Sequence, residues 1–572
     1  MRVLVLAAYN VFRLLTWPVW ALWCRLKRKS TRIVELSLRG RLEELPRSEP
    51  LLARWLSPLR TPRNDVASLR VLFERMAKDV RVEGLLLRIE PLEAGYPTLS
   101  SVRELVLGLR AQGKRVACYL PLDAGERELF VATAADEIVA MPHAGFSALG
   151  PRAARSYLAP LLDRLGVRVL VTAEGRYKTA AEPLVRASMS GPEREQLEAI
   201  VRTLHRTWSD AVGLKTNAAA LLQAGLFGAE RAKDLGVLDA VAYEDELPRR
   251  LGLADKERPI PHRAYLAGPR PFRFAPVRRK KRVAVLRLAG TIAERTRGAD
   301  GIDLHGSADA LRRLAEAPHI AGVVLYIDSP GGSAVVSELL HREIALLDAH
   351  KPVVSWMGNY AASGGYYLAA ATRAIVAHPA TLTGSIGVVS IRPVAERLME
   401  LLHVRRELVS VTPYADLNAL TRAPSPDEEA LLRAETERFY QRFLEVVATG
   451  RKRALSEIAQ LAEGRVWSGY DAREVGLVDQ LGGYREARAQ LDKLLPDAHA
   501  IDAEPLWVAA RKRGHPGLPA RQPPERREPP PELALVARLL GVELPASLWL
   551  LLELAGAGER VLAFAPDLPS IE

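Results

Sequence analysis

Short runs of β-branched and other apolar residues alternate with amphipathic, helix-like stretches along most of the chain. Residues 323–327 and 353–357 are two such runs, and each is followed by a helix-like segment. Ser425 and Pro426 open one of these helices as an N-cap and a first-turn proline, and apolar side chains follow at helical spacing. Alternating strands and helices predict an α/β fold with parallel sheets and crossover helices.

The pattern occurs twice. Residues 31–255 and 283–505 predict two copies of one unit, because matching segments recur at a nearly constant offset. Pro142 and Pro379 end equivalent apolar runs in the two copies. A basic, proline-rich linker at 256–282 separates the copies, and a proline-rich linker with a short apolar tail follows at 506–572.

Residues 1–30 form an apolar, tryptophan-rich stretch that is interrupted by Arg13 and Pro18. It predicts a membrane anchor or a helix lying in the membrane interface. A basic cluster at 25–29 follows the stretch, and this order of charges argues against export of the downstream chain.

Composition excludes few functions but narrows the choice. The chain of 572 residues is too long for one core, and 48% hydrophobic with 26% charged residues is typical of globular domains. The net charge of +12 comes with no nucleic-acid-binding motif, so we expect no nucleic-acid partner. Cys24 and Cys118 form no disulfide framework. No His, Cys and carboxylate cluster has zinc spacing, so we expect neither metal nor cofactor.

The candidate chemistry lies in two glycine turns of the second copy. Ser363 stands in the run Asn-Tyr-Ala-Ala-Ser-Gly-Gly-Tyr between a strand-like and a helix-like segment. A second turn, Asp-Ser-Pro-Gly-Gly-Ser at 328–333, ends the preceding strand. Two such turns at the ends of adjacent parallel strands predict a nucleophile facing an oxyanion hole, with the Gly332 and Gly364 amides as donors.

The first copy lacks these features. In the alignment through the shared prolines, Glu126 stands opposite Ser363. The first copy instead carries Lys178, in the run Tyr-Lys-Thr-Ala-Ala-Glu-Pro, and the second copy has Ala415 opposite it. The two copies therefore predict complementary parts of one site.

A serine nucleophile needs a base. In caseinolytic-type serine proteases a histidine follows the serine by about 25 residues, a spacing that leads here to Val388. His378 is one alternative, and Lys178 is another if burial lowers its pKa. A solvated surface lysine is the ordinary interpretation of such a residue.

Together these motifs resemble those of the long-form signal peptide peptidase A family, also called protease IV, over residues 31–505. The resemblance implies tandem crotonase-like (ClpP-like) domains and a dyad of Ser363 and Lys178. It further implies that Ser385, in the run Thr-Leu-Thr-Gly-Ser-Ile-Gly, orients the lysine.

The same resemblance implies a serine endopeptidase of the bacterial inner membrane with its catalytic domains facing the periplasm. Its implied substrates are cleaved signal peptides and other unfolded apolar peptides, and its implied assembly is a homotetramer. Two other functions stay open. One is a crotonase-like acyl-coenzyme A enzyme, which would use the same pair of oxyanion amides for an enolate. The other is a catalytically inactive membrane scaffold.

Overall fold

The computed structural model describes residues 9–19, 32–46, 65–254, 257–267, 280–296, 301–496, 501–510 and 562–564. The chain divides into two compact units. Unit 1 contains residues 1–150 and 204–281, and unit 2 contains residues 151–203 and 282–572. The compact units and the sequence repeat therefore differ in one segment: residues 151–203, within the first copy, pack with the second.

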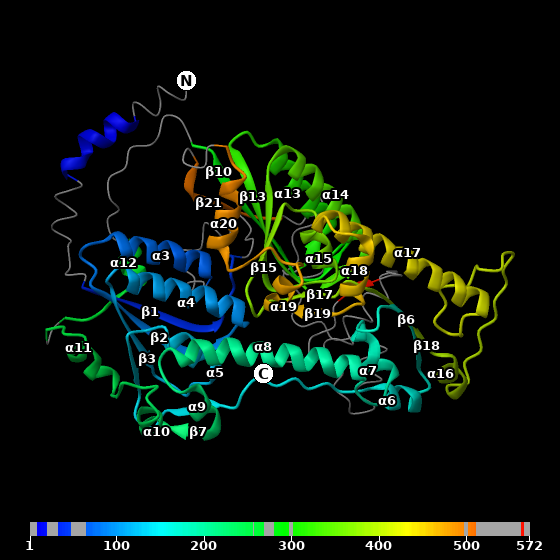
Figure 1. Cartoon of the computed structure of the whole chain (residues 1–572), viewed down its shortest axis with the longest axis horizontal. Helices are drawn as coiled ribbons and strands as arrows, with labels where there is room; N and C mark the ends of the chain where they lie inside the picture. The colour runs from blue at the N-terminus through cyan, green and yellow to red at the C-terminus, as the bar shows by residue number, and fades with distance from the viewer. Residues whose placement is uncertain are drawn as a thin grey trace. The chain divides into compact units, whose positions relative to one another are not determined.

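Unit 1 is built on a six-stranded, fully parallel sheet with the strand order β8-β4-β3-β2-β1-β9. Its strands β1, β2 and β3 are labelled in Figure 1. Strands β5 and β7 form a separate antiparallel pair. The strands are β1 Ile33–Arg41, β2 Gly84–Glu93, β3 Arg115–Leu120, β4 Glu137–Ala140, β5 Gly145–Ala148, β7 Gly225–Gly228, β8 Ala240–Val241 and β9 Ile260–Pro261. The helices are α3 Val66–Lys78, α4 Tyr96–Ala111, α5 Glu126–Ala132, α9 Ala218–Ala224, α10 Ala229–Asp234, α11 Leu247–Arg250 and α12 His262–Ala267, with a short 3-10 turn, η3 Glu244–Glu246. Helix α8, Gly191–Gly213, carries the chain from unit 2 back into unit 1.

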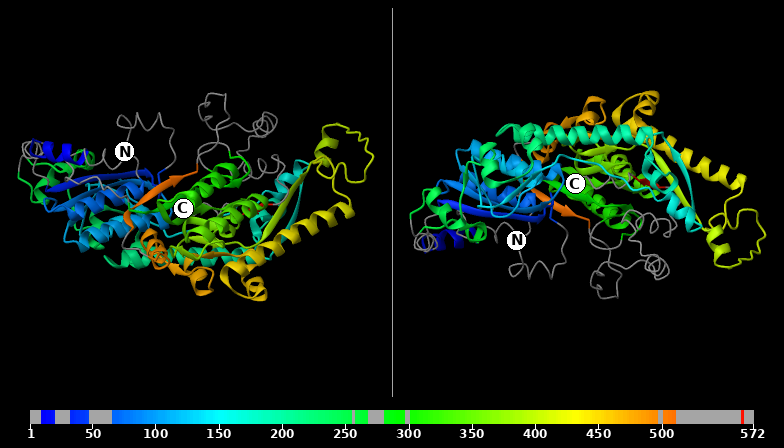
Figure 2. Two further views of the ribbon diagram at one scale, coloured as in Figure 1. Left: turned by 90° about the horizontal axis from the view of Figure 1, so that it is seen from above. Right: turned by 90° about the horizontal axis from the view of Figure 1, so that it is seen from below.

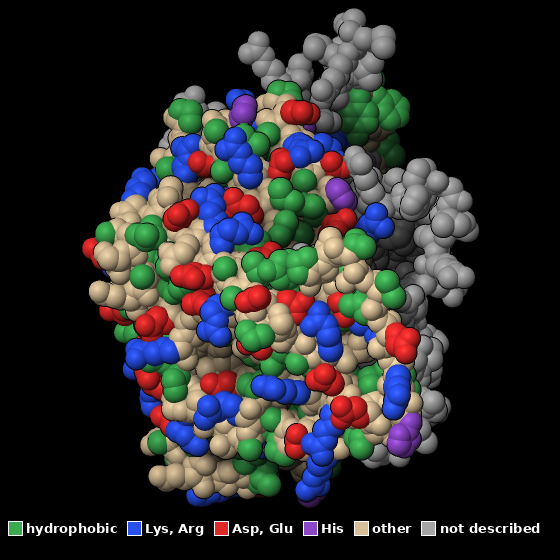
Figure 3. Space-filling model, turned by 90° about the vertical axis from the view of Figure 1, so that its right-hand side faces the viewer, with side chains coloured by type: hydrophobic (Ala, Val, Ile, Leu, Met, Phe, Trp, Pro, Cys, Tyr) green, Lys and Arg blue, Asp and Glu red, His purple; other side chains and the backbone are tan. Residues whose placement is uncertain are grey.

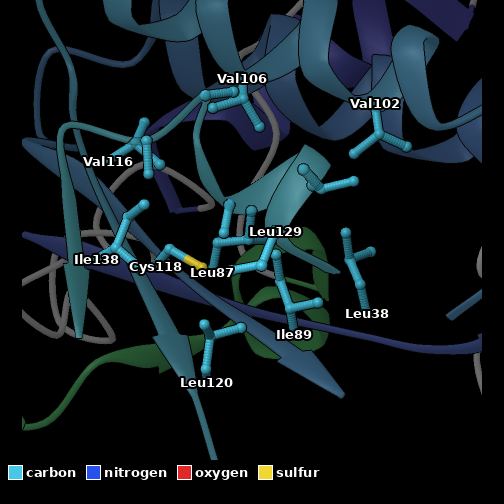
Figure 4. Packing of buried hydrophobic residues seen from close by; sticks show 14 of the residues in the cluster. Leu38, Leu87, Ile89, Val102, Val106, Val116, Cys118, Leu120, Leu129 and Ile138 are labelled. Atoms are coloured by element: carbon cyan, nitrogen blue, oxygen red, sulfur yellow. The ribbon is translucent and has the colours of Figure 1, made fainter. Parts of the chain in front are cut away.

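The unit 1 core explains why the apolar runs are continuous rather than alternating. Leu87, Cys118 and Ile138 come from β2, β3 and β4, and they pack beside Val102 of α4 and Leu129 of α5 (Figure 4). A parallel sheet with both faces covered favours such unbroken apolar strands. Strand β3, for example, is buried along five of its six residues.

Unit 2 repeats this architecture. Its main sheet contains the parallel order β20-β16-β15-β13-β10-β21, which matches the unit 1 sheet strand for strand. The antiparallel pair β17 and β19 corresponds to β5 and β7, and β17 joins this sheet beside β15. These strands are β10 Arg282–Ala289, β13 Ile320–Ser329, β15 Val353–Ala362, β16 Ala374–Ala377, β17 Leu382–Gly384, β19 Val466–Ser468, β20 Gln480–Leu481 and β21 Asp502–Ala509. The helices are α13 Leu304–Glu316, α14 Ala334–His350, α15 Gly364–Ala369, α16 Glu396–Leu401, α17 Pro426–Arg451, α18 Leu455–Ala462, α19 Gly469–Glu474 and α20 Tyr484–Lys493.

A second sheet in unit 2 has the order β12-β11-β14-β22-β18-β6. Strands β6 and β18 form a long antiparallel ladder from Val388↔Glu174 to Val394↔Arg168, and this ladder runs beside α17 (Figure 2). The strands are β6 Arg168–Glu174, β11 Ile292–Ala293, β12 Ile302–Asp303, β14 Gly331–Ser333, β18 Val388–Val394 and β22 Leu562–Phe564. The segment that carries β6 also contains α6 Ala159–Arg164, the 3-10 turn η2 Thr179–Ala181 and α7 Glu182–Val185.

The expectation of an α/β fold with parallel sheets is confirmed. The expected N-cap of α17 is also present, because the Ser425 hydroxyl accepts a hydrogen bond from the Glu428 amide at 3.3 Å. On the face shown in Figure 3, Lys and Arg side chains are interspersed with Asp and Glu. The positive net charge is therefore not gathered into one patch on that face.

At the N-terminus, residues 9–19 are helical, and Trp20, Trp23 and the basic cluster at 25–29 lie outside the described residues. Within the described part of the chain, no helix has the length and apolar character needed to cross a membrane. The expected membrane anchor is thus not confirmed. Part of the basic linker, at 268–279, and the proline-rich segment, at 511–561, also lie outside the described residues.

Two helical glycines with opposite surroundings test the packing of these units. A Cβ at Gly450 of α17 would lie 2.1 Å from the Ala370 carbonyl oxygen, whereas a Cβ at Gly108 of α4 would meet nothing within 4 Å. We expect Gly450→Ala to lower unfolding stability by about 1–3 kcal/mol through overpacking. Gly108→Ala should raise stability by about 1 kcal/mol through helix propensity alone. Thermal unfolding of both variants measures this, and wild-type stability of Gly450→Ala would contradict the packing.

Candidate active site

Ser363 lies at the sharp turn between β15 and α15, at the carboxyl end of a central strand of the unit 2 sheet. Its backbone has φ 54° and ψ −116°, a conformation that residues other than glycine rarely adopt. The Ser363 amide donates a hydrogen bond to the Gly384 carbonyl at 2.8 Å, so β17 holds the turn. The side chain is buried. Backbone strain of this kind is characteristic of functional sites.

The glycines that follow Ser363 are required by close packing. A Cβ at Gly364 would lie 2.6 Å from the Ser337 hydroxyl and 3.3 Å from the Gly331 Cα. A Cβ at Gly365 would lie 2.7 Å from the Ser329 carbonyl oxygen. The start of α15 therefore rests directly on the turn that follows β13. The two glycine turns expected from the sequence meet in the structure.

Gly332 shapes the second turn. Its φ of 153° is a value that side-chain-bearing residues avoid, and a Cβ there would lie 2.0 Å from the Ile292 carbonyl oxygen. The turn thus lies flat against β11. Its neighbour Gly331 donates its amide hydrogen to the Ser329 hydroxyl at 3.1 Å. Only glycine fits at position 332 without moving β11.

Lys178 reaches the same place from the segment at 151–203. Its Nζ lies 2.9 Å from the Ser363 Oγ and 3.0 Å from the Ser385 Oγ. The Ser385 carbonyl oxygen lies 3.1 Å from the same Nζ. All three side chains are buried. The structure therefore brings together the three residues that the motifs singled out, although Lys178 is separated from Ser363 by 185 positions.

Burial lowers the pKa of Lys178 well below its usual value, because an ammonium group loses its hydration there. The surroundings suit a neutral amine. Such an amine has two N–H donors, which match the hydroxyl and the carbonyl oxygen of Ser385, and one lone pair, which matches the Ser363 hydroxyl hydrogen. In this arrangement the amine is placed to accept the serine proton.

The turn that carries Lys178 is held by residues that the motif comparison did not identify. A Cβ at Gly464 would lie 2.6 Å from the Lys178 Cβ, and the Tyr177 amide donates to the Glu463 carbonyl at 2.8 Å. Gln196 of α8 donates to the Thr179 hydroxyl at 2.8 Å and accepts from the Val466 amide at 3.2 Å. These contacts join segments far apart in sequence, so no local spacing could reveal them.

The two other candidate base positions do not approach the serine in the same way. His378 accepts a hydrogen bond from the Ala380 amide at its Nδ1, at 3.2 Å, and burial lowers its pKa to about 4. Val388, at the spacing expected of a histidine, begins β18 and lines a pocket. Ala415, the counterpart of Lys178 in the sequence alignment, lies on an exposed loop.

Among the residues that the structure describes, no three His, Cys, Asp or Glu side chains are grouped so as to hold a metal ion.

Comparison with known proteins identifies the family. The chain matches peptidase family S49 twice, at residues 109–256 and 345–496, and these two regions make up more than half of it. The chain belongs to peptidase family S49.

Two relatives are similar to this S49 peptidase over most of its length. The chloroplastic serine protease SPPA of Arabidopsis thaliana is 32% identical over 82% of this chain and 69% of its own. Protease 4 of Salmonella typhi is 31% identical over 73% of this chain and 70% of its own. The match to a solved ClpP1 structure from Listeria monocytogenes covers 36% of this chain and 94% of that chain, at 15% identity. Its TM-score is 0.24, so no argument is based on it. The chain is thus a serine peptidase of this family.

In unit 1 of this S49 peptidase, the place equivalent to the serine is filled differently. Glu126 begins α5, and its carboxylate accepts hydrogen bonds from the Leu149 amide at 2.8 Å and the Gly150 amide at 2.5 Å. The carboxylate thereby ties the start of α5 to the loop after β5. Unit 1 therefore has the same strand order as unit 2, with a structural contact at the position aligned with Ser363.

The contact between Gly464 and Lys178 yields a specific prediction for this S49 peptidase. Gly464→Ala should lower peptide hydrolysis at least about tenfold, because the new Cβ would push the lysine turn away and alanine would be strained at φ 72°. Gly191→Ala is the matched control, since a Cβ at Gly191 would meet nothing within 4 Å. Full activity of a folded Gly464→Ala protein would show that the lysine turn tolerates displacement.

Proposed function

We propose that this S49 peptidase is an endopeptidase that works through a dyad of Ser363 and Lys178. The single observation that carries the proposal is the 2.9 Å separation of the Lys178 Nζ from the Ser363 Oγ within a buried site. The distance is that of a hydrogen bond along which a proton can pass. Because its pKa is lowered, Lys178 is present as a neutral, proton-accepting amine at a lower pH than an exposed lysine would be.

In the proposed mechanism Ser363 attacks the carbonyl carbon of the scissile peptide while Lys178 takes the hydroxyl proton. The carbonyl oxygen becomes an oxyanion, and the backbone amides of Gly332 and Gly364 donate hydrogen bonds to it. Lys178 then gives its proton to the leaving amine, and the C–N bond breaks. A water molecule, deprotonated by the same lysine, hydrolyses the acyl-serine and restores the free hydroxyl.

Ser385 orients the lysine in this proposal. Its hydroxyl and its carbonyl oxygen both lie within hydrogen-bond distance of the lysine Nζ. Its backbone is held in turn, because the Ser385 amide donates to the Arg465 carbonyl at 2.7 Å. With two acceptors fixed on one side of the amine, its lone pair points toward Ser363.

The substrates and the setting follow from the resemblance of the motifs to the signal peptide peptidase A family. We propose that the chain degrades cleaved signal peptides and other unfolded apolar peptides at the bacterial inner membrane, on the periplasmic side. We also propose a homotetramer and two crotonase-like domains related by duplication. The matching strand orders of the two units support the duplication.

Neither alternative function accounts for the lysine as well. An enolate-stabilising acyl-coenzyme A enzyme needs the oxyanion amides but has no use for a neutral amine against a serine hydroxyl. An inactive scaffold would not preserve a strained, buried serine together with its base. Turnover of an acyl thioester in place of a peptide would favour the first alternative.

Ser363→Ala is the direct test of the nucleophile. The change removes one hydroxyl and leaves the turn its Cβ, so the fold should persist while peptide hydrolysis falls at least about a thousandfold. A fluorophosphonate probe should label the wild-type chain at Ser363 and leave the variant unlabelled. Peptide hydrolysis at the wild-type rate by the purified variant would exclude Ser363.

The pH dependence tests the base. Because the folded pKa of Lys178 is lowered, its neutral fraction grows as pH rises through that lowered value. We therefore expect kcat/KM to increase with pH and to level off well below the ordinary lysine pKa of about 10.4. A profile that keeps rising to about pH 10.4 would mean that the base is an unperturbed lysine.

Substitutions at Lys178 separate its charge from its shape. Lys178→Arg should be as inactive as Lys178→Met, because guanidinium stays protonated.

Unfolding stability offers a readout without catalysis. The unfolded lysine binds a proton that the folded one releases, so stability should rise with pH between the lowered pKa and about 10.4, and Lys178→Met should remove that slope.

Ser385→Ala tests the orienting role. It removes one of the two acceptors of the amine and leaves the base in place, so we expect kcat to fall about tenfold to a hundredfold with KM nearly unchanged. Steady-state kinetics on one peptide substrate measure both constants. Unchanged kcat would reduce Ser385 to a structural turn residue.

A further inference from the structure

The turn that follows Lys178 is held by a buried ion pair that takes no part in the proposed mechanism. This turn is η2, which begins at the next residue. The Arg155 Nη2 donates a hydrogen bond to the Ala180 carbonyl oxygen of η2 at 3.1 Å. The Nε of the same guanidinium lies 3.0 Å from the Glu193 Oε1, in the first turn of α8. The other carboxylate oxygen of Glu193 accepts a hydrogen bond from the Tyr157 hydroxyl.

This ion pair lies in the interior of unit 2. The Glu193 side chain is 1% exposed and the Arg155 side chain 8% exposed. Burial raises the pKa of the Glu193 carboxyl, because the charged form loses its hydration. A buried ion pair adds little net stability over well-packed apolar side chains, so stability alone does not account for it. A planar guanidinium with two partners does fix geometry, and here it fixes the Ala180 carbonyl relative to α8.

Helix α8 also contacts η2 directly. One helical turn after Glu193, the buried Gln196 side chain donates to the Thr179 hydroxyl at 2.8 Å. Residues three positions apart lie on the same side of a helix, so both side chains come from one face of α8. The first turns of α8 thus hold η2 at two successive residues, of which the first directly follows the lysine.

We propose that Glu193 and Arg155 are positioning residues for the base: they fix the turn that follows Lys178 and so hold its amine in place. The inference rests on the proposed function, because it concerns the base of the proposed dyad. The amine acts across a hydrogen bond of 2.9 Å, and a displacement of about 1 Å can lower a rate by about a hundredfold. A displaced turn would also let water reach the amine and raise the lysine pKa toward its ordinary value.

Glu193→Gln tests the proposal, because it removes the charge and keeps the size of the side chain. On an apolar fluorogenic peptide, kcat should fall about tenfold to a hundredfold with KM nearly unchanged. The rise of kcat/KM with pH should also move to higher pH, because a hydrated Lys178 amine has a higher pKa. Glu198→Gln is the matched control, since Glu198 lies on the same helix with its side chain 55% exposed. An unmoved pH profile in folded Glu193→Gln would overturn the proposal, whatever the value of kcat.

The double variant Arg155→Met, Glu193→Gln covers the case in which a single change disturbs folding. Each single change leaves one buried group without its charged partner, whereas the double variant leaves neither charge. Its Tm should therefore lie above that of either single variant. Its kcat should stay as low as that of Glu193→Gln, because no guanidinium then holds the Ala180 carbonyl. Recovery of the wild-type kcat in the double variant would overturn the proposal and reduce the ion pair to a structural contact.

A measurement without catalysis separates this inference from the proposed function. Carbon-13 NMR at the lysine Cε follows the titration of Lys178 in the wild-type chain and in the double variant, and the resonance should titrate at higher pH in the double variant. An unchanged titration would overturn the positioning role even if Ser363 proved to be the nucleophile. A shifted titration together with wild-type hydrolysis by Ser363→Ala would instead support the hold on the lysine turn and reject the dyad.

Discussion

The structure of the site depends on keeping one lysine amine away from water. Lys178 is buried, and its Nζ contacts the hydroxyls of Ser363 and Ser385. Burial destabilises the charged form of the amine and so lowers its pKa, as the proposed role of Lys178 as a base requires. The cost of that burial must be met by contacts that satisfy a neutral amine, and the Ser385 acceptors together with the Ser363 hydroxyl provide them. An exposed lysine at the same distance would stay protonated and could not accept the serine proton.

Much of unit 2 serves this burial. Residues 151–203 lie within the first sequence copy, yet they pack with residues 282–572. The β6–β18 ladder joins them to the strand after Ser385. Segments on either side of Lys178 approach other parts of unit 2 closely, backbone against backbone. A Cβ at Gly175 would lie 2.3 Å from the Glu463 carbonyl carbon, and a Cβ at Gly387 would lie 2.8 Å from the Glu174 carbonyl oxygen. At these two glycines and at Gly464, the absence of a side chain allows neighbouring backbone segments to pack directly against the segment that carries Lys178.

Local patterns were sufficient to predict the α/β class, the repeat and the helix that begins after Ser425, because each depends on residues near one another in sequence. The glycine turns at 328–333 and around Ser363 were also predictable, since glycine is the residue that sharp backbone turns favour and it is visible in the local sequence. The pairing of Lys178 with Ser363 came from family resemblance, because spacing alone left His378 open. Gln196, Gly464 and β22 escaped prediction, since each acts through contacts with segments far away in the chain.

Unit 1 has the same sheet but a different residue at the position that aligns with Ser363. Its sheet has the same strand order, but the Glu126 carboxylate binds backbone amides where unit 2 has its serine. The Glu126 carboxylate accepts hydrogen bonds from two backbone amides, and these contacts do not depend on a buried lysine. The described sheet of unit 1 thus forms with a structural contact at the position where unit 2 has the serine of the proposed dyad.

The ionisation of Lys178 itself is the most direct measure of this account. Carbon-13 NMR of a chain labelled at the lysine Cε would follow each lysine through a pH titration, and Lys178→Met would assign the signal of interest. The account predicts that this one resonance titrates well below the ordinary lysine pKa of about 10.4, while exposed lysines titrate near that value. A Lys178 signal that titrates with the exposed lysines would contradict the account.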